Sequence, residues 1–358
     1  MKAVVFDSVY AIYQTEVPFA SQKVHAFDLD STLIHTRSGK IYSSFTDPTD
    51  YQWGTNVLAK LKELTKDGVI AVFSNQSSVS TKKGITPLYT KLTNLINELQ
   101  TIGVTRIIFF LAIKRDYNRK PSPSMWNLFV NKFNSKIVPK DTVFVGDAAG
   151  RANDFSCSDR KFAYNCKLEF MTPEQFFTQS NPEPFEWKGY NHHSIMSTNV
   201  LSVTLTLSDK IEMIICVGYP AAGKSSWFET SGCKQHGYIR VINQKKLCAD
   251  SLANSKSVYI DNTNLSLAAR KQYIDIATKF NIPVRCLWFS TPLDLCKHLN
   301  KCRSYLNKTS AVPHVTYNTA AKSFVQPSTN EGFKEIIEIP FVPKFNNKRE
   351  IRVFNYKW

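Results

Sequence analysis

The stretch Val24–Leu33 places two carboxylates directly after a short apolar run, and it constrains the first half of the chain most strongly. The run predicts a buried strand, which Asp28 and Asp30 follow at positions i and i+2. In an open α/β sheet, ligands bind at the carboxyl ends of the strands. One carboxylate could attack phosphorus, the other could transfer protons, and magnesium would offset their charge. The same D-x-D pattern also occurs in solvated turns and calcium loops, so this stretch alone leaves the chemistry open.

Apolar runs and amphipathic stretches alternate after this motif, which predicts a parallel sheet flanked by helices. Two short strands, 3–6 and 10–13, are predicted to precede it. The predicted strands end at 28, 73, 112 and 145, and the predicted helices cover 56–66, 87–102 and 124–133.

Polar side chains follow each of these predicted strands. Since the carboxyl ends of parallel strands converge on one crevice, we expect these side chains to meet there. A carboxylate nucleophile, a phosphate-binding hydroxyl, a cation and a metal-binding acid together predict a phosphotransfer site. In chain order they are Asp28 with Asp30, Ser74 with Asn75, Lys120 and Asp147.

The second half opens with an apolar run, 211–217, followed by a G-x4-G-K-S motif. A buried strand before the motif and a helix after it are the context in which such a loop binds phosphates. The loop amides would surround the phosphates, Lys224 would reach the β and γ oxygens, and Ser225 would bind magnesium. Further predicted strands (238–242, 257–261, 284–290) and helices (245–253, 266–280, 293–305) indicate a P-loop αβα domain. The predicted ATP-binding loop is Gly218, Tyr219, Pro220, Ala221, Ala222, Gly223, Lys224 and Ser225.

The chain is strongly basic, with a net charge of +16 over 358 residues. Lysine and arginine are spread through both halves, which favours a nucleic-acid partner over a membrane, although a basic protein without such a partner is the simpler alternative. None of the apolar runs reaches the roughly 20 residues of a membrane span, and the first 20 residues do not resemble a secretory signal. The 8 cysteines contain no C-x-x-C, which indicates reduced structural thiols in an intracellular protein.

Several stretches of the first half resemble the haloacid dehalogenase superfamily, and more narrowly the phosphatase half of the bifunctional polynucleotide kinase 3'-phosphatases. They are 27–34 with 36–40, 73–76, 119–121 with Met125 and Trp126, 143–151, and 154–160; Ser31 stands where the family usually has glycine. The second half is similar to the kinase half of the same family at 260–264, Ala269 with Arg270, 298–303, 331–333 and 337–341.

This resemblance implies roles for individual residues. Asp28 would be the nucleophile that forms an aspartyl-phosphate, and Asp30 the general acid and then the base. Ser74 and Lys120 would hold the phosphate, while Asp147 would bind magnesium with Asp28 and the backbone carbonyl of Asp30. Asp154 and Asp159 are further candidates that could also simply cap or pair locally. Arg303 would act in the lid over ATP, and the expected substrate-binding residues are Thr32, Arg37, Asn75, Asp261 and Asn262.

One position departs from the family pattern. After the P-loop, kinases of this family end the next strand with an aspartate that takes the proton of the 5'-hydroxyl. Here the best register places Gln244, or Asn243, at that position, and an amide does not accept a proton at neutral pH. Asp250 lies six residues further on, within a predicted helix. Since a general base contributes about 10²–10⁴-fold, the second domain is expected to bind ATP and to phosphorylate poorly or not at all.

We therefore predict an α/β protein with a haloacid dehalogenase-like 3'-phosphatase domain followed by a P-loop kinase-like domain. It would use magnesium and ATP and act on DNA ends that carry a 3'-phosphate or a 5'-hydroxyl, as a nuclear monomer without a membrane anchor. Alternatives are an active kinase, a C-terminal domain that only binds nucleic acid or ATP, and a small-molecule phosphatase. The family's N-terminal phosphopeptide-binding module is not expected. The predicted segments are an N-terminal extension 1–23, phosphatase 24–178, linker 179–209, kinase-like domain 210–345 and basic tail 346–358.

Overall fold

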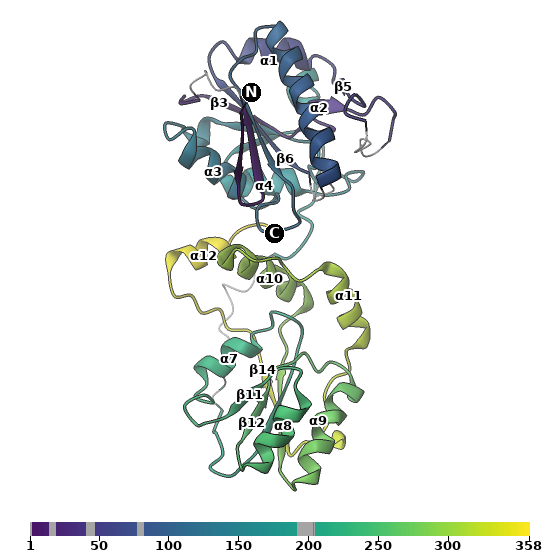
Figure 1. Ribbon diagram of the computed structural model, residues 1–358, viewed down its shortest axis with the longest axis vertical. Helices are drawn as coiled ribbons and strands as arrows, with labels where there is room; N and C mark the ends of the chain where they lie inside the picture. The colour runs from purple at the N-terminus through teal and green to yellow at the C-terminus, as the bar shows by residue number, and fades with distance from the viewer. Residues whose placement is uncertain (1, 14–18, 41–46, 77–81, 192–202, 204) are drawn as a thin grey trace. The chain divides into compact units, whose positions relative to one another are not determined.

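The computed structural model describes residues 2–13, 19–40, 47–76, 82–191, 203 and 205–358. It divides into two compact units, each of which is described by itself below (Figure 1). The first unit comprises Met1–Gly189, Ser304–Ser310 and Tyr356–Trp358, and the second comprises Tyr190–Arg303 and Ala311–Asn355. The finer domain bounds given above remain a prediction.

The first unit contains a 7-stranded sheet in the order β1-β2-β7-β6-β3-β8-β9. The strands β7, β6, β3, β8 and β9 are parallel, whereas the N-terminal hairpin β1-β2 adds antiparallel to the edge at β7. The short strands β4 (Ile34–His35) and β5 (Gln52–Trp53) form a separate pair. The main strands are β1 (Lys2–Phe6), β2 (Val9–Tyr13), β3 (Val24–Phe27), β6 (Val69–Asn75), β7 (Ile107–Ala112), β8 (Val143–Val145) and β9 (Glu169–Met171).

Helices cover both faces of this sheet, because its central strands are apolar on both sides. In β6, Ile70 and Val72 pack with α1 and α2, while Ala71 and Phe73 face α3 and α4 on the other side (Figure 1). Because successive side chains of a strand point to opposite faces of the sheet, a separate hydrophobic core forms on each face. The helices of this unit are α1 (Val57–Leu64), α2 (Lys82–Thr101), α3 (Ser124–Lys132), α4 (Ser158–Cys166) and α5 (Pro173–Thr178), with a 3-10 turn, η2, at Pro139–Asp141.

The second unit is a 5-stranded, fully parallel sheet in the order β11-β12-β10-β13-β14. Its strands are β10 (Met213–Val217), β11 (Ile239–Val241), β12 (Val258–Ile260), β13 (Val284–Phe289) and β14 (Glu335–Ile339). The helices α8 (Lys245–Ala253) and α9 (Leu267–Lys279) pack on one face. Residues of α7 (Lys224–Thr230), α10 (Leu293–Asn307) and α11 (His314–Ser323) pack on the other, and η3 (Thr329–Glu331) and α12 (Lys348–Phe354) complete the unit.

These two α/β units confirm the predicted fold class, with two differences at the level of single elements. The helix predicted to begin at Pro87 begins at Lys82, so Pro87 lies inside it, where its missing N–H removes one helical hydrogen bond. The segment 346–358, predicted as a tail, contains α12, whose Val353 and Phe354 are buried. All 8 cysteines are free and buried. Among the described residues, no helix is both long and apolar enough to cross a bilayer.

Candidate phosphatase and nucleotide sites

The two aspartates Asp28 and Asp147 lie side by side because their strands are neighbours. The strands β3 and β8 pair in parallel with Phe27 opposite Val145, and the backbone N–H of Asp28 donates to the carbonyl of Val145 at 2.8 Å. Each aspartate therefore leaves the sheet at the same carboxyl edge. Thr32 contacts the second of them, because its Oγ1 accepts a hydrogen bond from the Asp147 N–H at 3.1 Å.

A buried lysine joins this edge from the loop that follows β7. The Nζ atom of Lys120 lies 2.6 Å from Oδ1 of Asp28 and 2.8 Å from Oδ1 of Asp159. All three residues are buried. Asn75, at the end of β6, holds the loop in place, since its Oδ1 accepts from the backbone N–H of Lys120 at 2.9 Å. Of the residues predicted to meet at this edge, the structure thus brings Asp28 and Lys120 into contact, and Asn75 binds the backbone of Lys120.

Asp159 is the member of this cluster to which the sequence assigned no role of its own. It lies in the first turn of α4, and its Oδ2 accepts a hydrogen bond from the backbone N–H of Ala148 at 3.1 Å. Asp154 is different, because its carboxylate bonds the backbone N–H groups of Ala149 and Arg151 and pairs with the Arg151 side chain. Of the two further candidates, Asp159 therefore belongs to the cluster and Asp154 stabilises the loop.

The cluster carries three carboxylates whose ligand atoms, one each from Asp28, Asp147 and Asp159, all lie within 4.8 Å of one another. Burial, and then the charges of Asp159 and Asp147, raise the pKa of Asp28 well above its usual range, although Lys120 opposes this. Burial and the charge of Asp159 raise the pKa of Asp147 to about 7. Burial alone would lower the pKa of Lys120, but the charges of Asp159 and Asp28 raise it above its ordinary value.

Such a group of oxygen ligands fits a small divalent cation. Magnesium prefers carboxylate oxygens, and one lysine cannot balance three carboxylates. Burial raises the pKa values of Asp28 and Asp147 most, and the neighbouring carboxylates raise them further. The candidate ligands are thus Asp28, Asp147 and Asp159. The side chain of Asp30, by contrast, points to other partners.

Asp30 contacts a glutamine and a lysine. Its Oδ2 accepts from Nε2 of Gln76 at 2.5 Å, and its Oδ1 lies 3.3 Å from Nζ of Lys91. The amide of Gln76 also donates to Oγ of Ser74 at 2.9 Å, so it connects the predicted acid to the predicted phosphate-binding hydroxyl. Sequence reasoning missed both Gln76 and Lys91. A detectable signal existed for Lys91, because it falls at helical spacing between Leu88 and Leu95 on an apolar face.

Two further residues that the sequence singled out in this half are Ser31 and Arg37. Ser31, at the position where the family usually has glycine, adopts a left-handed φ of 60°. This conformation strains a non-glycine residue only modestly when the residue is small and polar. Arg37 is exposed, and in the part of the chain that the structure describes no hydrogen bond or ion pair joins it to the cluster. A role of Arg37 toward substrate therefore remains a prediction.

In the second unit, the loop Gly218–Ser225 joins β10 to α7, as the motif predicted. Gly218 and Gly223 have positive φ values of 158° and 106°, which a side chain would strain. The buried Nζ of Lys224 donates to the carbonyls of Gly218 and Tyr219 at 2.9 and 2.6 Å. Burial lowers the pKa of Lys224, and the charge of Arg303 acts in the same direction, so Arg303 of α10 lies within electrostatic reach of the loop.

The carboxylate of Asp261, directly after β12, lies beside this loop. Its Oδ2 accepts from Oγ of Ser225 at 2.7 Å and from Nε of Arg240 at 2.8 Å. The neighbouring Asn262 donates to the hydroxyl of Tyr273 at 2.9 Å. The predicted residues Ser225 and Asp261 therefore meet, and Arg240, which sequence reasoning missed, is a third member of this group.

The position at which the sequence predicts a replaced kinase base follows β11. Gln244 is exposed directly before α8, and the backbone N–H of the preceding Asn243 bonds the side chain of Asn262 at 3.2 Å. Asp250 lies further along α8, on an exposed part of the helix. The residue before Gln244 thus contacts the Asp261–Asn262 segment, whereas Asp250 lies within α8.

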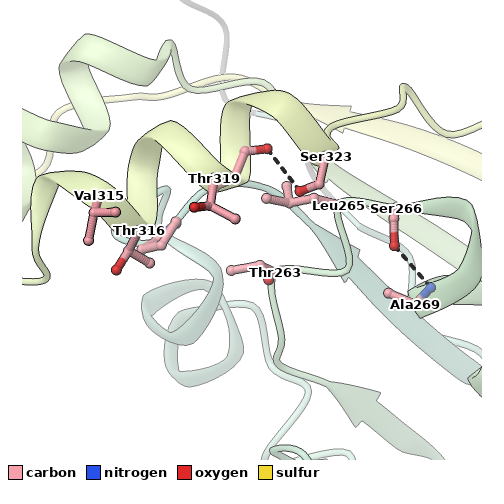
Figure 2. Close-up of a pocket in the computed structure, with 10 residues that line it drawn as sticks. Thr263, Leu265, Ser266, Ala269, Val315, Thr316, Thr319 and Ser323 are labelled. Atoms are coloured by element: carbon pink, nitrogen blue, oxygen red, sulfur yellow. Dashed lines mark hydrogen bonds between the residues drawn. The ribbon is translucent and has the colours of Figure 1, made fainter.

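A pocket of about 440 Å³ opens beside the P-loop (Figure 2). Figure 2 shows Thr316 and Thr319 of α11 on one side and Thr263, from the segment after Asp261, on the other. Hydroxyl and small apolar groups line it without a charged side chain, which suits the uncharged part of a small ligand. The lining residues are Pro220, Thr263, Leu265, Ser266, Ala269, Val315, Thr316, Thr319, Ala320 and Ser323.

Comparison with known proteins gives matches over both units. A family described as "Polynucleotide kinase 3 phosphatase" matches residues 23–177, and an AAA domain family matches residues 242–327. The bifunctional polynucleotide phosphatase/kinase of Schizosaccharomyces pombe is 34% identical over 333 residues, which cover 90% of this chain and 80% of that protein. The polynucleotide 3'-phosphatase of Saccharomyces cerevisiae is 30% identical over 207 residues, which cover 43% of this chain and 87% of that protein.

Proposed function

This chain belongs to the family of bifunctional polynucleotide phosphatase/kinases, and from that premise we propose that its first unit removes 3'-phosphates from DNA ends. The observation that carries the proposal is the cluster of Asp28, Lys120 and Asp159 beside Asp147. It combines a buried carboxylate at the end of a strand, a cation that can bind a phosphate and an excess of oxygen ligands. The product would be a 3'-hydroxyl end.

In the first step, a carboxylate oxygen of Asp28 attacks phosphorus, and the bond from phosphorus to the 3'-oxygen breaks. The electron pair of that bond goes to the 3'-oxygen, which takes a proton from the carboxyl group of Asp30. Lys120 and the hydroxyl of Ser74 hold the non-bridging oxygens of the phosphate. In the second step, Asp30 takes a proton from water, the water oxygen attacks phosphorus, and Asp28 is released.

Magnesium bound by Asp28, Asp147 and Asp159 would supply positive charge that draws the phosphate to the nucleophile. The three carboxylates provide the oxygen ligands, and the crowding of their charges favours a divalent cation over an empty site. Thr32 orients Asp147 through the hydrogen bond to its N–H. The predicted role of the Asp30 carbonyl as a ligand is part of the same proposal.

For the second unit we propose nucleotide binding with weak or absent kinase activity. The P-loop, Lys224 and the Ser225–Asp261 pair support nucleotide binding. Gln244 at the position of the base argues against efficient transfer to a 5'-hydroxyl, since its amide does not accept a proton. A fully active kinase is the alternative, favoured by the same intact P-loop and by the proximity of Arg303.

One assay tests both parts of this proposal. An oligonucleotide duplex with a 3'-phosphate and a 5'-hydroxyl at a nick is incubated with magnesium and labelled ATP. We expect release of inorganic phosphate from the 3' end and little label at the 5' end. Absence of phosphate release would refute the 3'-phosphatase proposal, and rapid labelling would establish the alternative of an active kinase. A role in nuclear DNA repair is the cellular setting that we propose for this activity.

A further inference from the structure

A lysine on the apolar face of α2 is buried next to the predicted general acid. Lys91 is 6% exposed, and Leu95, one helical turn further on, is fully buried. Burying an ammonium group is costly unless a counter-charge meets it, and an apolar residue would fit such a face without this cost. Asp30 supplies a counter-charge, because its Oδ1 lies 3.3 Å from Nζ of Lys91.

The other oxygen of Asp30 is bound as well. Nε2 of Gln76 donates to Oδ2, so the carboxylate has one donor on each oxygen. The two donors come from different elements, the segment after β6 and the middle of α2. Asp30 itself is more open, with 46% of its side chain exposed, so packing alone does not fix its orientation.

We propose that Lys91 is a positioning residue that orients the carboxyl group of Asp30 toward the leaving 3'-oxygen. This inference rests on the proposed function, because it assigns Lys91 a part in the proton transfer of that reaction. Lys120 contacts Asp28 and Asp159, so the two lysines have separate tasks. Lys120 faces the nucleophile and Lys91 faces the acid.

The test compares two substrates that differ in their need for an acid. The leaving group of a 3'-phosphorylated oligonucleotide is a sugar oxygen, which requires a proton. The leaving group of p-nitrophenyl phosphate is a stable phenolate, which does not. Lys91→Met should lower kcat/KM for the oligonucleotide by about 10–100-fold and for p-nitrophenyl phosphate by less than about threefold. Lys91→Arg, which keeps charge and donor, should recover most of the loss. Lys62→Met, at an exposed lysine of α1, is the matched control and should change neither value.

A second measurement separates positioning from a merely structural role. In the background Asp30→Ala, Lys91→Met should cost nothing further, because the residue through which it acts is absent. Equal losses on both substrates, or a further loss in the Asp30→Ala background, would overturn the inference. If Lys91→Met does not fold, Lys91→Gln is measured in the same way. A wild-type protein without activity on the oligonucleotide would instead refute the proposed function.

Discussion

The carboxylate of Asp159 occupies the space that any side chain at position 146 would need. A Cβ atom on Gly146 would lie 2.6 Å from Oδ2 and 2.7 Å from Cβ of Asp159. Gly146 therefore permits α4 to bring its first carboxylate against the end of β8. Without this close approach, Asp159 could not reach both Lys120 and the other two aspartates.

We expect Gly146→Ala to weaken the proposed metal site, because the added methyl group must displace Asp159. Magnesium titrations of 3'-phosphatase activity should show an apparent affinity reduced by about 10–100-fold, the usual effect of a disturbed ligand shell. Gly103→Ala is the control. It strains a positive φ of 85° but has nothing within 4 Å of the new Cβ, so it should leave the affinity for magnesium unchanged. Equal affinities in both variants would argue against Asp159 as a ligand.

Asp28→Asn should abolish removal of 3'-phosphates, because an amide cannot form the acyl-phosphate bond. The fold should remain intact, since the substitution removes one charge from a crowded buried group and keeps its shape. Phosphate release and the thermal midpoint are measured together. Activity above a few per cent of the wild-type rate would exclude Asp28 as the nucleophile.

Magnesium should raise the thermal midpoint of the first unit, because the proposed site of three carboxylates exists in the native protein and not in the unfolded chain. EDTA should reverse the shift and stop phosphate release. The shift should be smaller in Asp147→Asn, which lacks one ligand. The same shift in that variant and in the wild type would place the cation elsewhere.

Gln244→Asp should increase kinase activity, because it would supply a carboxylate at the proposed position of the general base. We expect transfer of label from ATP to a 5'-hydroxyl oligonucleotide to rise by about 10²-fold over the wild type. Asn243→Asp tests the neighbouring register, and Lys246→Asp, at an exposed position of α8, controls for added negative charge. An increase with Lys246→Asp as large as with Gln244→Asp would contradict the assignment.

Lys224→Ala should abolish binding of a fluorescent ATP analogue and leave 3'-phosphate removal unchanged. Lys224 lies in the P-loop of the second unit, whereas the phosphatase cluster lies entirely in the first. Lys234→Ala, an exposed lysine after α7, is the control for binding. A large loss of phosphatase activity in Lys224→Ala would show that the two activities are coupled.

Much of the candidate site could be predicted because its residues follow strands directly. Asp28, Asn75 and Asp147 are positioned by the ends of parallel strands, and a parallel sheet brings such ends together whatever the loops do. Gln76 also follows a strand, β6, although nothing in the sequence singled it out. Lys91 could not be placed in this way, because its role depends on where α2 crosses the sheet, which is set by the packing of Leu92, Leu95 and Leu99 and has no local signature.

The sequence by itself determined the two α/β units, the P-loop, the order of the phosphatase residues and the absence of a carboxylate at position 244. These features can be predicted from short stretches, because hydrophobic periodicity and motif spacing extend over only a few residues. Only the tertiary structure decided that Asp159 belongs to the acidic cluster, whereas Asp154 binds the backbone of its own loop. It also decided that Asp30 contacts Lys91 and Gln76. The physical reason is that burial and close contact between distant segments, such as Gly146 with Asp159, select one partner for each charge.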